Sequence, residues 1–192
     1  MNTVKLTYLL LRGAKYLRAR MTGTVEWKDI EQFEESWKQR IKEMAQFICP
    51  HESVLDLGCG KMWLKDFLKD NEYFPVDYVA RDKTTIIANF NKRQFPKVKA
   101  DVTFVSGALE YVIDCEWFVE SICEMSRKCI LSYCTIESYP NIIMRRKKAW
   151  KNSLSRDQVV ALFARKGMRL NCESVALNNH IFLFTNVEKK PT

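Results

Sequence analysis

Two acidic residues and two glycines mark the place where this sequence could hold a ligand. Residues 54–60 read VLDLGCG, so Asp56 lies near the end of a short apolar run and Gly58 and Gly60 follow it. The pattern predicts a buried strand, a glycine turn and a helix, whose first amides are unpaired and carry positive partial charge. Asp77 follows Asp56 by about 20 residues, the spacing at which a second acid accepts hydrogen bonds from ribose hydroxyls. The spacing favours an adenosine-containing ligand.

The residues that follow the turn distinguish between classes of nucleotide. A dinucleotide-binding turn has a third glycine where this chain has Trp63. A phosphate-binding loop would need Ser or Thr where Met62 follows Gly60 and Lys61. NAD and ATP therefore fit poorly. S-adenosylmethionine has no pyrophosphate, and its carboxylate, ribose and sulfonium suit the loop amides, the acid and electron-rich surroundings, so the pattern favours this cofactor.

Four segments, taken in order, carry a resemblance to a known family. They are VLDLGCG at 54–60, PVD at 75–77, IIANFNKRQFP at 86–96 and DVTFVSGALEY at 101–111. Together they resemble the Rossmann-type, or class I, S-adenosylmethionine-dependent methyltransferases. The resemblance extends over about residues 50–185, and the order of the segments makes it more specific than any one of them.

The resemblance implies cofactor contacts for residues at the ends of the predicted strands. They are Asp56, Gly58, Cys59, Gly60, Asp77, Asn89, Phe90 and Gly107. The first four would line the methionine end of the cofactor, although Cys59 is expected mainly to pack there. Asp77 would hold the ribose. Asn89 and Phe90 would border the adenine, and Gly107 would lie beneath the transferred methyl group.

Glu110 and Tyr111 are the candidate catalytic residues, because the resemblance places the segment GALEY beside the methyl group. Tyr111 stands where the family often has histidine. A hydroxyl acceptor would need a general base, and Asp114 and His51 are alternatives to these two, so the base stays unassigned. No metal site is expected, because the seven cysteines form no C-x-x-C pair and neither histidine has a second ligand nearby in sequence.

Two residues depart from the family's usual pattern. Met62 replaces a usual glycine, which would narrow the loop, and Asn89 replaces the acid that usually bonds the adenine amine. The amide oxygen of Asn89 can still accept that bond. These departures leave a second hypothesis open, in which the protein is a non-catalytic Rossmann-like binding or scaffold module.

Strands and helices are predicted to alternate along most of the chain. The predicted strands are 53–57, 73–79, 84–88, 101–106 and 129–134, and the predicted helices are 26–48, 62–69, 116–126 and 155–166. Residues 168–175 and 180–185, joined through Asn178 and Asn179, predict an antiparallel hairpin. This order predicts an α/β fold, a doubly wound, mostly parallel sheet with helices on both faces and a C-terminal antiparallel hairpin. We expect a single methyltransferase-like domain over 26–192, after a basic amphipathic segment at 1–25.

The chain has a net charge of +8, and its basic residues cluster in two places. Residues 4–20 predict a basic amphipathic helix that could contact a membrane surface, with packing on the domain or an unstructured tail as alternatives. The second cluster is Arg145, Arg146, Lys147, Lys148 and Lys151. It would suit an anionic partner or simply a solvated surface. The chain has no apolar run of about 18 residues, so we expect a cytoplasmic protein with at most peripheral membrane contact.

Segments outside the predicted sheet are expected to contact the methyl acceptor. They are the helix near 22–49 and the insertion 135–153, which mixes aromatic, aliphatic and basic side chains. Such a mixture suits an apolar acceptor with phosphates or carboxylates, such as a lipid-linked or activated sugar, and could equally contact RNA. The leading prediction is a methyltransferase for a small molecule or a glycan or lipid-linked sugar intermediate. Nucleic acid is a less favoured partner, so an RNA-binding methyltransferase is a further alternative.

Overall fold

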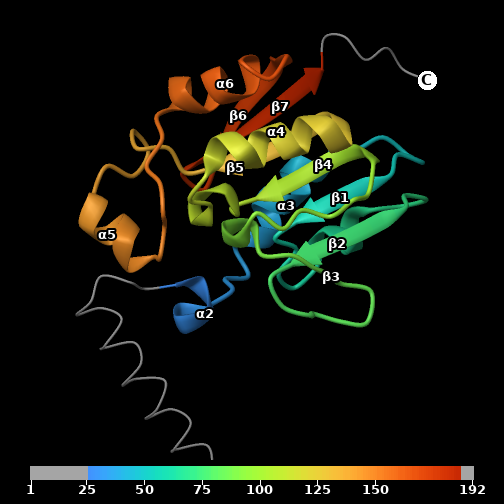
Figure 1. Ribbon diagram of the computed structural model, residues 1–192, viewed down its shortest axis with the longest axis horizontal. Coiled ribbons are helices and arrows are strands. Elements are labelled where there is room, and N and C mark those ends of the chain that lie inside the picture. Colours follow the sequence, from blue (N-terminus) through green and yellow to red (C-terminus); the bar gives the residue numbers. More distant parts are fainter. Residues whose placement is uncertain (1–25, 187–192) are drawn as a thin grey trace, which may run out of the picture.

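A seven-stranded sheet forms the centre of the protein (Figure 1). The computed structural model describes residues 26–186. The strands are β1 (Val54–Leu57), β2 (Tyr73–Asp77), β3 (Ile86–Ile87), β4 (Ala100–Ser106), β5 (Ser126–Tyr133), β6 (Met168–Ala176) and β7 (Asn179–Asn186). The α-helices are α2 (Trp27–Ile30), α3 (Trp37–Ala45), α4 (Cys115–Met125), α5 (Ile142–Lys147) and α6 (Arg156–Ala164). Three short 3-10 helices are η1 (Trp63–Phe67), η2 (Phe90–Lys92) and η3 (Leu109–Tyr111).

The strand order is β3-β2-β1-β4-β5-β7-β6. β1 pairs in parallel with both β2 and β4, and the pairs β2–β3 and β4–β5 are also parallel. β7 is antiparallel to β5 and to β6. The predicted doubly wound, mostly parallel sheet with a C-terminal hairpin is therefore confirmed. The chain reverses its direction of progress across the sheet between β1 and β4, and ligands of such sheets bind beyond the carboxyl ends of the strands at this point.

Each face of the sheet has its own hydrophobic core, which confirms helices on both faces (Figure 1). On one face Leu57 packs in a core with Phe118 of α4 and residues of α6. On the other face Val54 shares a core with Met44 of α3 and residues of η1. Successive strand residues point to opposite faces, so Asp56 shares the α3 face with Val54.

The C-terminal hairpin turns one residue earlier than the sequence indicates. Leu177 and Asn178 form the turn, with φ of +50° and +63°. Two-residue hairpin turns of the type that matches strand twist need positive φ at both central residues. Ser155 caps the N-terminus of α6, because its side chain accepts a hydrogen bond from the amide of Gln158 at 3.1 Å.

The single helix predicted over residues 26–48 is wrong, because α2 and α3 are separated by residues 31–36. Phe33 leaves the helical pattern and packs between Trp27 and Trp37, with ring centroids 5.8 Å and 6.2 Å from theirs. Burial of large rings against one another outweighs the modest helix propensity of this stretch. We refer to Trp27, Phe33 and Trp37 as the aromatic cover.

The helix predicted over 62–69 is also wrong, since only the short 3-10 helix η1 forms there. Met62 has φ of +55°, a left-handed conformation that does not lead into a right-handed α-helix. The expected α-helix N-terminus at the glycine turn is therefore missing. The amides of Gly58 and Cys59 instead donate to the carbonyl oxygen of Val76, at 2.8 Å and 3.0 Å.

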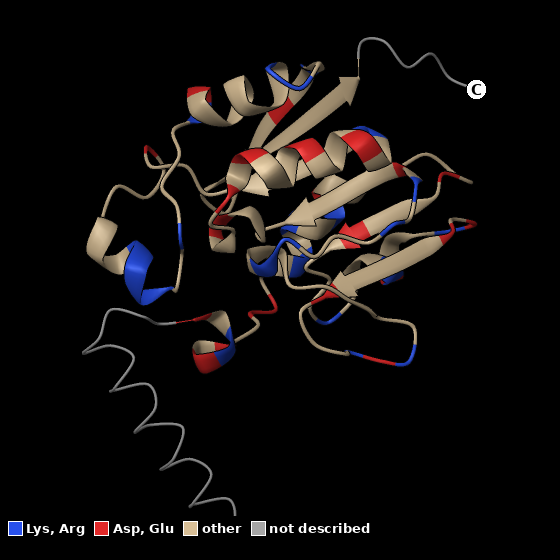
Figure 2. Cartoon of the chain, viewed as in Figure 1, with Lys and Arg blue, Asp and Glu red and all other residues tan. Residues whose placement is uncertain are grey.

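The insertion 135–153 contains a helix, α5, that the sequence analysis did not predict. Arg145 of α5 is 1% exposed, and its guanidinium donates to oxygen atoms of residues 133–153 at 3.0–3.3 Å. The prediction that Arg145 faces an anionic partner or solvent is therefore wrong, because this side chain holds the insertion together. Arg146 and Lys147 remain exposed on α5 (Figure 2).

Within residues 26–186, every helix is too short or too polar to span a bilayer. The basic helix predicted at 4–20 lies outside the described residues. Its membrane contact, and the domain limits 1–25 and 26–192, stay predictions.

Candidate functional site

A cavity of about 990 Å³, including open space at its mouth, lies at the carboxyl ends of the central strands. The predicted cofactor residues that line it are Asp56, Gly58, Cys59, Gly60, Asp77, Asn89, Phe90 and Gly107. They follow β1, β2, β3 and β4, and the parallel sheet brings these strand ends to one edge. Their contact with a cofactor stays a prediction, but their gathering around one cavity is a property of the structure.

The two glycines of the turn allow close approach of neighbouring segments. Gly58 and Gly60 have φ of +81° and +51°, which side chains rarely adopt. A Cβ atom at Gly58 would lie 2.7 Å from Cβ of Ala108, and one at Gly60 would lie 2.6 Å from Cε1 of Phe33. The aromatic cover therefore lies directly on the glycine turn. Between the glycines, burial raises the pKa of the Cys59 thiol, which keeps this side chain a neutral packing group.

Asp77, the predicted ribose acid, is 3% exposed and already accepts hydrogen bonds from the protein. Its Oδ2 accepts from the amide of Gly60 at 2.9 Å, which fixes the glycine turn to the end of β2. Its Oδ1 accepts from Nη2 of Arg81 at 3.1 Å. A carboxylate has about four lone-pair positions, so Asp77 keeps the capacity to accept from a ribose hydroxyl.

Asp56, the other acid of the cavity, is also 3% exposed. Its Oδ2 accepts a hydrogen bond from the hydroxyl of Tyr73 at 2.7 Å. Burial raises the pKa of Asp56 to about 7, and the nearby Asp77 adds to the rise while the Tyr73 hydrogen bond opposes it. Asp56 is thus partly protonated near neutral pH, unlike an ordinary surface aspartate.

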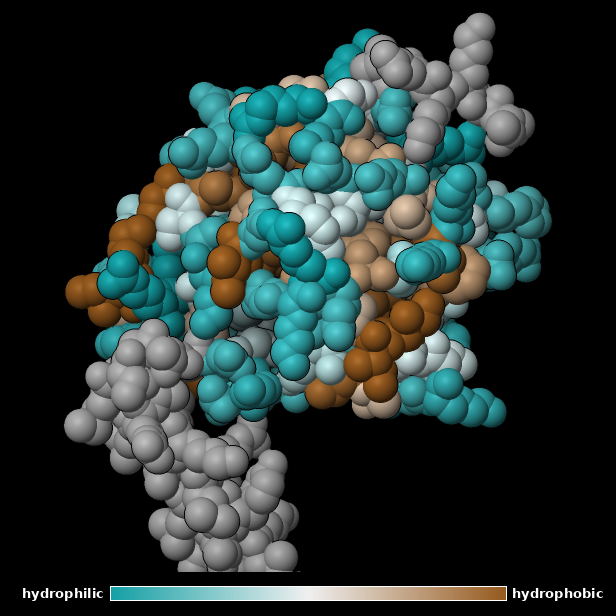
Figure 3. Space-filling view, viewed as in Figure 1, coloured by the Kyte–Doolittle hydropathy of each residue, from teal (hydrophilic) through white to brown (hydrophobic). Residues whose placement is uncertain are grey.

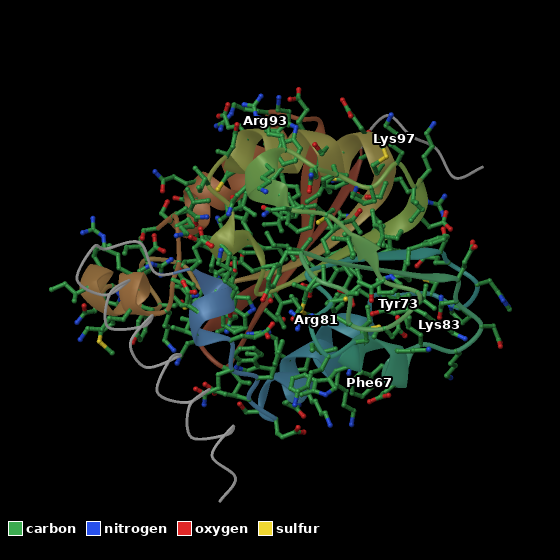
Figure 4. The ribbon with its side chains drawn as sticks, turned by 60° about the horizontal axis from the view of Figure 1, so that its bottom comes forward. Phe67, Tyr73, Arg81, Lys83, Arg93 and Lys97 are labelled. Carbon is green, nitrogen blue, oxygen red and sulfur yellow. The ribbon has the colours of Figure 1, made fainter. Side chains whose placement is uncertain are left out.

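Arg81, labelled in Figure 4, contacts both Asp77 and the ring of Phe33 in the aromatic cover, and sequence reasoning missed it. Its Nη2 donates to Oε1 of Glu31, which follows α2, and to Asp77. The hydroxyl of Tyr78 also donates to Oε1 of Glu31, at 3.2 Å. The pairing could not be predicted, because Glu31 and Arg81 are distant in sequence and no local pattern links them.

The two predicted adenine residues have structural contacts of their own. The Oδ1 of Asn89 accepts from the amide of Asn91 at 3.0 Å, so it caps η2. An amide oxygen has two lone pairs, so one remains for a ligand donor. Phe90 packs with Phe95 and Phe118, at centroid distances of 6.0 Å and 4.9 Å, while lining the cavity.

A second cavity, of about 910 Å³ including its open mouth, adjoins the first. Trp37, Arg40, Gly107 and Tyr111 line both. Both predicted catalytic residues therefore line the second cavity, and Tyr111 lines the first as well.

Glu110 is 2% exposed, and its Oε1 accepts from the amide of Cys134 at 2.9 Å. Its Oε2 is buried and has no hydrogen-bond partner among residues 26–186. Burial raises the pKa of Glu110. Burial also raises the pKa of Tyr111, so its phenol stays protonated and can donate a hydrogen bond.

Arg40 is the second functional residue that sequence reasoning missed, and here a signal was present. It lies on the apolar side of α3 with Ile41 and Met44, and it is 6% exposed. A cation on the buried face of a helix is unusual unless it is paired. That placement within the apolar repeat could have marked Arg40 as a candidate.

Comparison with solved structures shows which proteins share this fold. The structure of CalO1, a methyltransferase in calicheamicin biosynthesis, with bound S-adenosylhomocysteine, has a TM-score of 0.62 and 13% identity over 78% of this chain. The chain spans 54% of that protein. The 1,6-didemethyltoxoflavin-N1-methyltransferase of Burkholderia thailandensis has a TM-score of 0.65 and 9% identity, over 98% of this chain and 92% of its own.

The chain has the class I methyltransferase fold. The magnesium protoporphyrin IX methyltransferase of Synechocystis PCC 6803 is a further neighbour, with a TM-score of 0.62 and 10% identity over 91% of this chain and 99% of that one. No protein-family model matches the sequence, and no curated protein matches it. The fold that the sequence resemblance implied is therefore confirmed, although the sequence identities are low. In this methyltransferase fold, the first cavity lies at the usual ligand position.

Proposed function

We propose that the protein is a methyltransferase that uses S-adenosylmethionine to methylate a small molecule. The observation that carries the proposal is the first cavity, which brings two buried carboxylates and three glycines of positive φ to one sheet edge. Solved structures of the same fold hold S-adenosylhomocysteine or S-adenosylmethionine.

The residues of the cavity fit this cofactor with one change from the sequence-based expectation. Gly58 and Gly60 let Ala108 and Phe33 approach the main chain closely beside the cavity, and Asp77 can accept from ribose hydroxyls. The turn amides, however, are taken by Val76 and Asp77. We therefore assign the cofactor's carboxylate to Lys61, an exposed cation that also lines the cavity.

When bound, the cofactor supplies a methyl group on a sulfonium; the acceptor's lone pair forms the new bond and the electrons of the broken C–S bond stay on sulfur. The chain's own part is alignment and exclusion of water, which can contribute on the order of 7–11 kcal/mol. The aromatic cover closes the first cavity beside the glycine turn. Trp27 packs on Tyr111 at a centroid distance of 5.0 Å, which continues the apolar wall to the junction of the cavities.

For an acceptor that loses a proton, we assign the general base to Glu110. Glu110 lines the second cavity, and its Oε2 has no hydrogen-bond partner in residues 26–186. The raised pKa of Glu110 makes its carboxylate a stronger base. Tyr111 would donate a hydrogen bond to the acceptor, because its phenol stays protonated.

Calorimetric titration of the protein with S-adenosylhomocysteine tests the proposal. We expect binding, and at least tenfold weaker binding for Asp77→Ala, because the ribose loses its acceptor. Asp66→Ala is the matched control, because Asp66 is exposed on η1 and lines neither cavity. No heat with the wild-type protein, and no competition with S-adenosylmethionine, would refute the proposal.

A non-catalytic binding module is the second candidate function. The observation in its favour is that Arg81 and the aromatic cover already engage Asp77 and the glycine turn. Methyl turnover on any acceptor would exclude it. A glycan or lipid-linked sugar acceptor, peripheral membrane contact and a cytoplasmic location have no supporting observation in the cavities, and we restrict the proposal to a small molecule.

A further inference from the structure

The second cavity contains a buried cation that the protein leaves largely unpaired. Nε of Arg40 donates to Oγ of Ser106 at 3.3 Å, its one hydrogen bond within residues 26–186. The buried carboxylate of Glu110 acts on the guanidinium electrostatically without forming an ion pair with it, and it partly offsets the cost of burying this charge. Its Nη2 would lie 3.1 Å from a Cβ atom at Gly107, so it faces the junction of the two cavities. An arginine has five N–H donors, and most of those of Arg40 have no acceptor in the described chain.

Arg145 shows how this protein satisfies a buried arginine when its role is structural. All three of its guanidinium nitrogens donate to protein oxygens, and the group stacks 4.6 Å from the ring of Trp150. Arg40 is nearly as buried but has one such bond. Because burying a charge without a partner is costly, the difference points to an anionic ligand at Arg40.

A second cation and four rings complete the lining of this cavity. Lys148 is exposed at the wall and has no carboxylate of residues 26–186 within ion-pair distance. The rings belong to Trp37, Tyr111, Tyr139 and Trp150. Tyr139 and Trp150 pack edge to face at 5.8 Å, and the guanidinium of Arg40 lies 5.7 Å from the ring of Trp37.

We propose that the second cavity binds the methyl acceptor and that this acceptor is a flat aromatic acid, with its carboxylate on Arg40. Guanidinium and carboxylate form paired hydrogen bonds, Lys148 adds positive charge at the mouth, and the rings hold an aromatic body by offset or edge contacts. The assignment of the ligand as the acceptor rests on the proposed function, whereas the carboxylate site itself does not.

The proposed acceptor and the cofactor occupy different cavities. Lys61 lines the first cavity only, and Lys148 lines the second only. Each cavity thus has its own cation at the mouth, and Arg40 lies where the two meet. An acid held by Arg40 and Lys148 would have the rest of its body beside Glu110, the assigned base.

The test is calorimetry with 2-naphthoate, its neutral amide 2-naphthamide and the sugar acid glucuronate, each with and without saturating S-adenosylhomocysteine. We expect 2-naphthoate to bind at least tenfold more tightly than 2-naphthamide, and glucuronate not to bind. Arg40→Gln should lower the affinity for 2-naphthoate at least tenfold and make it equal to that for the amide. Affinity for S-adenosylhomocysteine should fall less than affinity for 2-naphthoate, although Arg40 also lines the first cavity.

Two further variants keep the test decisive if Arg40→Gln does not fold. Lys148→Gln changes an exposed residue and should weaken 2-naphthoate binding about threefold. Arg146→Gln, an exposed cation of α5 that lines neither cavity, should leave it unchanged.

Several outcomes would overturn the proposal. They are equal binding of acid and amide, binding of glucuronate alone, absence of binding by any probe, and a loss of S-adenosylhomocysteine affinity in Arg40→Gln without loss of 2-naphthoate affinity. Arg40-dependent binding of 2-naphthoate in a protein that does not bind S-adenosylhomocysteine would uphold the carboxylate site and refute the proposed function.

Discussion

Asp56 combines a buried position with a hydrogen bond from Tyr73, and its pKa of about 7 makes stability depend on pH. The pKa of Asp56 is near 4 in the unfolded chain and about 7 in the folded protein. At pH values between these two, the folded state holds a proton at Asp56 that the unfolded state has lost. The free energy of unfolding therefore falls as pH rises through this window, by up to about 1.4 kcal/mol per pH unit from this group.

Asp56→Asn should remove this dependence, because the amide does not ionise and its oxygen can still accept from Tyr73. We expect the variant to gain stability relative to the wild type as pH rises from 5 to 8. Urea unfolding at several pH values measures the effect. Parallel pH curves for the two proteins would contradict the assigned pKa.

Arg145 is the other residue whose role is decided by its hydrogen bonds. Arg145→Ala should destabilise the protein by about 2–4 kcal/mol, because it leaves several buried carbonyl oxygens without donors and opens space beside Trp150. Arg146→Ala, on the exposed side of the same helix, should change stability by less than about 0.5 kcal/mol. Equal unfolding midpoints in urea for the two variants would show that Arg145 does not anchor the insertion.

At the scale of elements, α2 and the segment to α3 form a separate layer over the strand ends. The aromatic cover holds this layer to the glycine turn, and Glu31 ties it through Arg81 to β2. Because the carboxylate of Glu31 is only a quarter exposed, its pairing is screened less than a surface ion pair.

Glu31→Gln should loosen this layer without unfolding the sheet. Backbone amides of residues 27–37 should exchange with solvent roughly two- to fivefold faster, the effect of about 0.5–1 kcal/mol. Glu35→Gln is the matched control, because Glu35 lies in the same segment and forms its ion pair with Lys38 at the surface. Hydrogen exchange measured by mass spectrometry should distinguish the two variants. Identical exchange rates in both would show that Glu31 does not hold this layer to the sheet.

At the scale of the molecule, the two cores meet at the first cavity. Its lining includes Ile41, Leu64 and Phe104 from the core on the α3 face and Ala88 and Val112 from the other core. On the surface, the two helices α4 and α5 differ in charge. α4 presents acidic side chains, whereas α5 presents basic ones together with the exposed side chains of Ile142, Ile143 and Met144 (Figures 2 and 3). A ligand in the first cavity would therefore be coupled to the folding of both layers.

We expect S-adenosylhomocysteine at a hundredfold excess over its dissociation constant to stabilise the whole domain by about 2.7 kcal/mol. This corresponds to a rise of roughly 5–10 °C in the unfolding midpoint for a protein of this size. Thermal unfolding followed by circular dichroism measures it, with ATP as the control nucleotide. An equal shift with ATP would show that the cavity does not select the proposed cofactor.

The local sequence was sufficient for the sheet, the hairpin and the residues at the strand ends. Largely apolar runs such as 54–57 and 129–133 predict buried strands, and parallel pairing then brings Asp56, Asp77 and Gly107 to one edge. These features depend on patterns within a few residues, which is why they could be predicted.

Only the tertiary structure decided how that edge is covered and charged. Phe33 leaves a helical pattern to pack on Gly60, Met62 adopts a left-handed conformation in place of a helix start, and Arg81 reaches Glu31 across the fold. Arg40 and Arg145 are both buried, yet all the guanidinium nitrogens of Arg145 donate hydrogen bonds and Arg40 has one hydrogen bond within residues 26–186. Such outcomes depend on contacts between distant segments, whose burial and hydrogen-bond energies outweigh local propensity.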